Sequence, residues 1–105
     1  MIFRRSVVAS FGLIFCVGTQ AHAETIQVVI DKLVFSPASI TAKVGDTVEW
    51  VNKDAFAHTA TVKGGWEVMI PAKKTVAQQL DKAESVGFYC RFHPNMKGSL
   101  TVQAD

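Results

Sequence analysis

Hydrophobic and polar residues alternate along most of the chain after residue 24, with the period of two that is typical of half-buried β-strands. In the first such segment, residues 25–31, Ile26, Val28 and Ile30 fall on one face. The same pattern predicts strands over residues 39–44, 47–52, 58–62, 66–70, 75–80 and 85–90, and a last strand that carries Leu100 and Val102. Turn-forming residues, mainly Gly, Pro and Asp, separate most of the segments, and none has convincing helical periodicity. Seven or eight short strands of this kind predict an all-β sandwich.

The first 23 residues have a different pattern. Arg4 and Arg5 precede an uncharged apolar stretch over residues 6–18, and a small-x-small motif ends at Ala23. This order is typical of a secretory signal peptide with its cleavage site. The apolar stretch is shorter than the roughly 20 residues that a transmembrane helix needs. We therefore predict a signal peptide over residues 1–23 and an exported domain over 24–105 that does not insert into the membrane.

Removal of the signal peptide changes the charge of the protein. The whole chain has 11 Lys and Arg against 9 Asp and Glu. Loss of Arg4 and Arg5 leaves 11 − 2 = 9 basic residues, so the predicted mature chain has no net charge. It also has no polybasic tract, which argues against nucleic acid as a partner. Its length fits one small domain, which we expect to be a monomer.

One short segment concentrates the candidate chemistry. Cys90, His93 and Met96 lie within seven residues, and His58 is the only other histidine of the predicted mature chain. Cys90 is its only cysteine, so the mature chain cannot form an internal disulfide. An unpaired thiol is a liability in an oxidising compartment, unless a metal binds it. Two imidazoles, one thiolate and a weak thioether are the donors of a blue copper site.

The donor types suggest a role for each residue. We assign His58 and His93 as equatorial imidazoles, Cys90 as the equatorial thiolate and Met96 as the weak axial ligand of one copper ion. A buried free thiol is the alternative for Cys90 taken alone. Met69 is the only rival axial ligand, and its apolar neighbours predict a place in the core. The aromatic residues are also predicted to fill the core: Phe35, Trp50, Trp66 and Phe88.

The spacing of the three clustered donors restricts their backbone. Positions 90, 93 and 96 could share one face of a helix, but Pro94 removes an amide donor and disfavours helical geometry at His93. In a regular strand, residues three apart point to opposite faces. We therefore predict a loop between two strands, which His58 approaches from the start of an earlier strand.

These residues carry a resemblance to a known family. The motif Cys90-x-x-His93-Pro94-x-Met96 resembles the small blue copper proteins, the cupredoxins, and its spacing is most similar to that of amicyanin. Residues 35–37, 44–48 and 50–52 are also similar to this family, and the resemblance covers essentially all of residues 24–105. It implies a Greek-key sandwich with copper at one end and one-electron transfer in the periplasm. The implied partners are transient redox proteins, with a dehydrogenase or cytochrome as donor or acceptor.

Two further expectations come from the resemblance. Cupredoxins commonly carry Asn directly after the first ligand histidine, where it ties the ligand loops together, whereas this chain has Thr59, whose hydroxyl and amide are candidates for that link. Electrons in this family are thought to leave through the loop histidine, which here is His93, inside an apolar patch. Phe92, Pro94 and Phe56 are the candidates for that patch.

Other functions remain to be compared. The same donors would serve a copper-binding or delivery protein that does not shuttle electrons. Zinc could occupy the imidazoles and the thiolate, although a thioether as fourth ligand disfavours it. An enzyme is not expected, because a blue copper site has no open strong position for a substrate and this chain has no spare histidines. One cysteine is also too few for a c-type haem motif.

Overall fold

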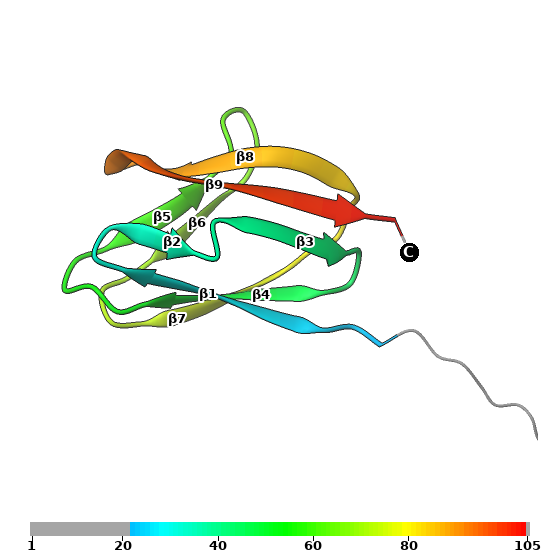
Figure 1. The fold of residues 1–105 in the computed structure, drawn as a ribbon, viewed down its shortest axis with the longest axis horizontal. Helices are drawn as coiled ribbons and strands as arrows, with labels where there is room; N and C mark the ends of the chain where they lie inside the picture. The colour runs from blue at the N-terminus through cyan, green and yellow to red at the C-terminus, as the bar shows by residue number, and fades with distance from the viewer. Residues whose placement is uncertain (1–21, 105) are drawn as a thin grey trace, which may run out of the picture.

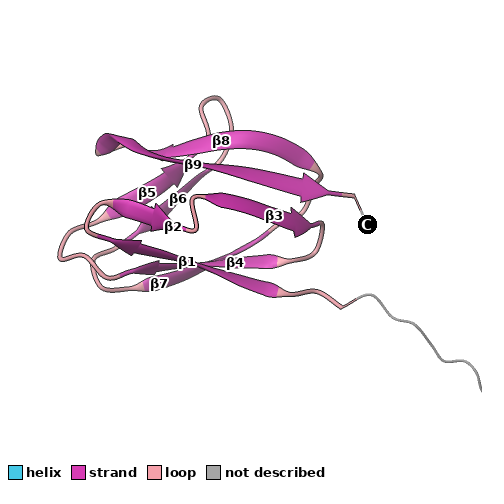
Figure 2. Ribbon diagram, in the orientation of Figure 1, coloured by secondary structure: helices cyan, strands magenta, loops and turns pink. Residues whose placement is uncertain are grey.

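The computed structural model describes residues 22–104, which form two β-sheets packed face to face (Figures 1 and 2). One sheet has the strand order β2-β1-β4-β7 and the other the order β3-β9-β8-β5-β6. Most of the predicted signal peptide lies outside the described residues, among which no helix is long and apolar enough to span a membrane. The strands are β1 (Thr25–Asp31), β2 (Val34–Ser36), β3 (Ser39–Lys43), β4 (Thr47–Asn52), β5 (His58–Thr61), β6 (Glu67–Ile70), β7 (Thr75–Gln79), β8 (Glu84–Cys90) and β9 (His93–Gln103).

The predicted all-β sandwich is confirmed, but it has nine strands where seven or eight were expected. The additional strand, β2, pairs antiparallel with β1 through a two-residue turn. The turn residues Lys32 and Leu33 have φ angles of 56° and 67°, in the left-handed region. Gly, Asn and Asp normally occupy such turns, so the sequence at Lys32 and Leu33 contains no turn signal.

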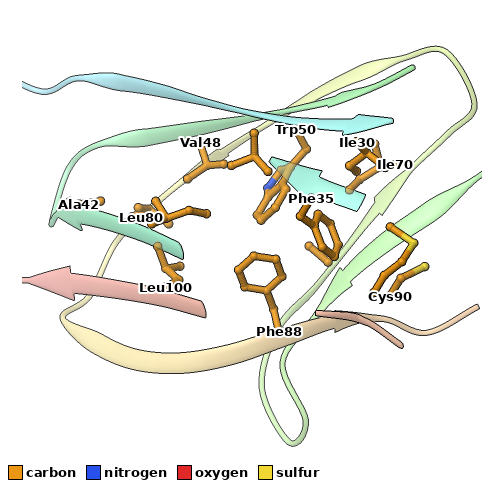
Figure 3. Close-up of a cluster of buried hydrophobic side chains, with 14 of the residues drawn as sticks. Ile30, Phe35, Ala42, Val48, Trp50, Ile70, Leu80, Phe88, Cys90 and Leu100 are labelled. Atoms are coloured by element: carbon orange, nitrogen blue, oxygen red, sulfur yellow. The ribbon is translucent and has the colours of Figure 1, made fainter. Parts of the chain in front are cut away.

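The alternating residues fill the space between the sheets. Phe35, Trp50 and Phe88 lie at the centre of this core in edge-to-face contacts, with ring centroids 4.9–5.9 Å apart (Figure 3). This geometry suits aromatic rings because the positive edge of one ring meets the negative face of the next. Trp66 is only partly buried and packs against the outside of the core. The predicted aromatic core is therefore confirmed at three positions, with Trp66 at its margin.

Four chain connections gather at one end of the sandwich, on the left in Figure 1. They are the β1–β2 turn, the β4–β5 loop, the β6–β7 loop and the β8–β9 turn, comprising residues 32–33, 53–57, 71–74 and 91–92. We call this region the site end. The pairing of His58 with Ile70 and of Cys90 with His93 places all four residues at this end. The sheets therefore bring three of the candidate donors to one edge of the core.

Gly98 gives a test of this packing. A β-carbon at this position would overlap the ring of Phe88 and lie 2.7 Å from the carbonyl oxygen of Ala38. We expect Gly98→Ala to lower the free energy of unfolding by about 1–3 kcal/mol, measured by urea denaturation. Gly87→Ala is the matched control, because the nearest atom to its new β-carbon would be 3.8 Å away. Equal losses in the two variants would contradict the close packing at Gly98.

Candidate metal centre

The donor atoms of His58, Cys90 and His93 converge at the site end. They lie within 4.8 Å of one another, and the Cys90 sulfur is 3.6 Å from Nδ1 of His58 and 3.7 Å from Nδ1 of His93. Metal–nitrogen and metal–sulfur bonds of about 2.0 and 2.3 Å at a near-tetrahedral angle span about 3.6 Å. The three donors are therefore already spaced to share one metal ion.

A carboxylate fixes the ring of His58. Oδ2 of Asp54 lies 2.8 Å from Nε2 of His58, which is fully buried. Because an ionised carboxylate only accepts hydrogen bonds, Nε2 carries the proton of the neutral ring. Nδ1, which faces the Cys90 sulfur, then keeps its lone pair free for a metal.

Asp54 is itself held by the β1–β2 turn. Its Oδ1 accepts a hydrogen bond from the amide of Lys32 at 2.7 Å, and its Oδ2 accepts one from the amide of Leu33 at 3.1 Å. Burial opposes the ionisation of Asp54, but its hydrogen bonds with Lys32, His58 and Leu33 outweigh burial and lower its pKa. Two successive amides in left-handed geometry form an anion-binding concavity, which here holds a side chain of the protein.

The loop that carries Asp54 is organised by Asn52, the last residue of β4. The Asn52 side-chain amide donates to the carbonyl oxygens of Phe56, Ile70 and Pro71 at 3.0–3.2 Å. Its side-chain oxygen accepts the amide of Asp54 at 2.9 Å. All the hydrogen-bonding groups of this buried side chain are thus used, which fixes the backbone between β4 and His58. Neither Asn52 nor Asp54 was predicted from the sequence to support the site, although two polar residues shortly before a candidate ligand could have drawn attention to them.

Thr59 links the two ligand segments, as its position after His58 suggested. Its amide donates to the Cys90 sulfur at 3.4 Å, and its hydroxyl accepts the amide of Arg91 at 2.8 Å. The hydroxyl also meets that of Thr61 at 2.8 Å, and Thr61 donates to Glu67 at 2.8 Å. Because Arg91 and Glu67 form a bidentate ion pair, these four side chains and the Arg91 amide close a ring beside the thiol.

The predicted loop over residues 90–96 is shorter than expected. Only Arg91 and Phe92 form the turn, and β9 already begins at His93. Cys90 pairs with His93, but the next pair joins Tyr89 to Lys97, so residues 94–96 have no partner on β8. Cys90 and His93 meet across a hairpin, which removes the objection that residues three apart on one strand diverge. The unpaired residues form a bulge that departs from strand alternation.

The two methionines differ in burial. Met96 is 4% exposed and lines the same surface depression as His93. The prediction that Met69 lies in the core is wrong, because its side chain is 45% exposed. Met69 pairs with Thr59, whereas His58 pairs with Ile70. Since neighbouring residues of a strand point to opposite faces, the side chain of Met69 leaves the sheet away from the His58 ring.

Apolar side chains surround His93, which is partly exposed. The ring of Phe56 lies 5.5 Å from that of His93, and Phe92 and Pro94 line a depression with it. All three expected residues are therefore at this surface. Leu33, from the β1–β2 turn, also lines the depression and was not anticipated. We call these four apolar residues and His93 the apolar patch.

The fold and donor set agree with comparisons to known proteins. Residues 6–102 match the Cupredoxin-like domain family, and the chain belongs to this family. The chain is 31% identical to plastocyanin from Scenedesmus fuscus, over 68% of this chain and 88% of the relative. It is 28% identical to amicyanin from Paracoccus versutus, over 77% and 67% of the two chains. The crystal structure of that amicyanin gives a TM-score of 0.66 at 29% identity, covering 81% of this chain and 85% of that one.

The cofactor of this protein is a copper ion, and its candidate site suits one. Copper(I) favours soft sulfur, whereas copper(II) favours imidazole nitrogen, so a mixed set can hold both states. The Thr59 amide points at the Cys90 sulfur, where it would stabilise a thiolate. The donors are also held in place by contacts from four segments: the β1–β2 turn, the β4–β5 loop, β5 and the β8–β9 turn. The site therefore needs little rearrangement to receive the ion.

Asp54→Asn tests the support of His58. The new amide group must face either the Leu33 amide and the His58 ring or the Lys32 amide, all hydrogen-bond donors to the carboxylate. We expect a loss of about 1–3 kcal/mol in unfolding free energy by urea denaturation. We also expect copper affinity, measured by chelator competition, to fall about 10–100-fold.

The matched control for this substitution is Asp31→Asn. Asp31 is exposed at the end of β1, close to the same turn. The change in charge is the same, but no supporting hydrogen bond to His58 is lost. Equal effects of the two substitutions on copper affinity would show that charge, rather than the contact with His58, matters.

Proposed function

We propose that this protein is a one-electron carrier with a single blue copper centre, whose ligands are His58, Cys90, His93 and Met96. The observation that carries this proposal is the convergence of three donor atoms within 4.8 Å in a cupredoxin-like sandwich. Bound copper supplies a couple between copper(I) and copper(II). Plastocyanin and amicyanin, to which the chain is similar, support this reading.

The residues around the site divide the work of such a carrier. His58 and Cys90 are fully buried, and the Asp54 carboxylate and Thr59 amide hold them in place. Donor atoms that are fixed in this way move little when the oxidation state of the ion changes, and this favours fast electron transfer. His93 reaches the surface inside the apolar patch, which excludes water and gives a partner close access to its ring.

This role is not catalytic. The candidate donors are all protein side chains that fill the strong positions around the ion, so no place is left for a substrate. The partners we propose are redox proteins that bind transiently at the apolar patch, such as a dehydrogenase or a cytochrome. A small interface suits them, because a carrier must release each partner quickly.

Copper titration of residues 24–105 tests the ligand set. We expect an intense absorption at roughly 600 nm that ascorbate bleaches reversibly. Cys90→Ser should abolish the band, whereas Met69→Leu, at the exposed methionine, should leave it unchanged. A colourless copper complex would contradict the proposal. Transfer of the ion to an acceptor apoprotein, without electron exchange with a cytochrome, would instead identify a delivery protein.

We also propose that the chain is exported to the periplasm and cleaved between Ala23 and Glu24. The backbone of Glu24 is held on both sides, because its amide donates to Asp46 at 2.9 Å and its carbonyl accepts the amide of Thr47 at 2.9 Å. Ala23, by contrast, is exposed. Hydrolysis of this peptide bond would leave an ammonium group on Glu24 facing the Asp46 carboxylate. Cleavage would thus strengthen an existing contact.

Melting temperatures can test the pairing at Glu24. A chain that begins with a free Glu24 amine should melt roughly 2–5 °C higher than one with an acetylated amine. The pair requires a protonated amine, so this advantage should be present at neutral pH and be lost at a pH high enough to deprotonate the amine. Asp46→Asn should erase the difference between the two chains. Sequencing of the exported protein should begin at Glu24, and another start would contradict the proposed cleavage.

A further inference from the structure

The site end carries an uneven distribution of charge. Four exposed lysines lie in its connections: Lys32 after β1, Lys53 after β4, and Lys73 and Lys74 before β7. None of the four forms an ion pair within residues 22–104. The exposed acidic residue nearest to them in sequence is Asp31, at the end of β1. The four lysines thus outnumber the two carboxylates beside them in the chain, the exposed Asp31 and the buried Asp54, which leaves an excess of positive charge at this end.

These lysines belong to one continuous surface. The amide of Lys53 donates to the carbonyl of Ile30 at 2.8 Å, next to the β1–β2 turn. The ammonium group of Lys73 donates to the carbonyl of Lys53 at 2.7 Å. Asp54, which lies among them, is 9% exposed, and its oxygens are occupied by the Lys32 amide and other donors of the protein. We call Lys32, Lys53, Lys73 and Lys74 the basic strip.

The basic strip borders the apolar patch. Leu33 directly follows Lys32 in the β1–β2 turn and lines the depression that contains His93, Phe92 and Pro94. One surface thus presents a partly exposed imidazole, an apolar surround and a cationic margin. Arg91, whose guanidinium lies over the Phe92 ring of the patch, adds little charge because it is paired with Glu67 at 2.8 Å.

We propose that this surface docks an acidic redox protein, one whose electron-transfer face carries several carboxylates. The inference rests on the proposed function and names the class of partner for it. The predicted mature chain has no net charge, so a partner would be steered by this local asymmetry rather than by the total charge. Cations at the margin of an interface act mainly on the association rate and its dependence on salt.

A redox-inert anion can locate the surface directly. Hexacyanochromate(III) is paramagnetic and broadens the amide resonances of residues near which it binds. In the mature protein loaded with copper(I), we expect broadening at Lys32, Lys53 and Lys74. We expect much less at Lys63 in the β5–β6 loop and at Lys82 in the β7–β8 loop, which both lie away from the site end (Figure 1). Uniform broadening, or broadening centred on Lys63 and Lys82, would overturn the proposal.

Matched variants test whether the strip affects electron transfer. The triple variant Lys32→Gln, Lys53→Gln, Lys74→Gln keeps the contact of Lys73 with the Lys53 carbonyl. The control triple variant Lys43→Gln, Lys63→Gln, Lys82→Gln changes the net charge equally and also alters exposed lysines.

The measurement is the second-order rate of oxidation by hexacyanoferrate(III) at low ionic strength. We expect about a 10-fold loss in the strip variant and less than about a 2-fold loss in the control. The difference should shrink at about 0.3 M salt, where charges are screened. With cationic tris(phenanthroline)cobalt(III), the strip variant should not be slower. Equal losses in both triple variants would overturn the proposal.

The two proposals can fail separately. If the protein forms no blue centre, the proposed carrier function fails. The hexacyanochromate(III) map can then be recorded on the copper-free protein, because that anion exchanges no electron. If the blue centre forms and the two triple variants behave alike, only the inferred acidic partner fails.

Discussion

The candidate site depends on one buried carboxylate. Asp54 cannot be buried in its ionised form without donors, and its donors come from the β1–β2 turn and from His58. The same contacts hold a left-handed turn without glycine, set the proton position on a ligand candidate and join the two sheets. A side chain that binds no metal in our proposal thus decides whether the ligands are ready for one.

The sequence predicted best what local pattern determines. Alternation gave the bounds of β1 and β4 correctly, and the Cys90–Met96 spacing pointed to the donors that the hairpin brings together. Prediction from the sequence failed where tertiary contacts override local preference. The left-handed turn at Lys32 is an example, because hydrogen bonds to Asp54 stabilise it. Met69 was misplaced because an apolar run suggests burial, although only alternate residues of a strand can face the core.

Thr59 links the two ligand segments, although the family resemblance leads one to expect Asn at this position. Its amide reaches the Cys90 sulfur, and its hydroxyl reaches the amide of Arg91, so one small residue holds both ligand segments. A threonine has no second side-chain group with which to extend this link. Thr61, Glu67 and Arg91 extend it instead, through hydrogen bonds on the outer face of the sheet.

Because residues 94–96 form a bulge, sequence changes there can alter the surroundings of His93 without altering the pairing of β8 with β9. Pairing resumes at Lys97 opposite Tyr89, so the three intervening residues do not set the register of β8 and β9. Insertions or deletions between Pro94 and Asn95 would reshape the surroundings of His93 without sliding hydrophobic residues out of the core. Evolution or design can thus vary these two positions on a fixed scaffold, provided that the buried Met96 keeps its place beside the donors.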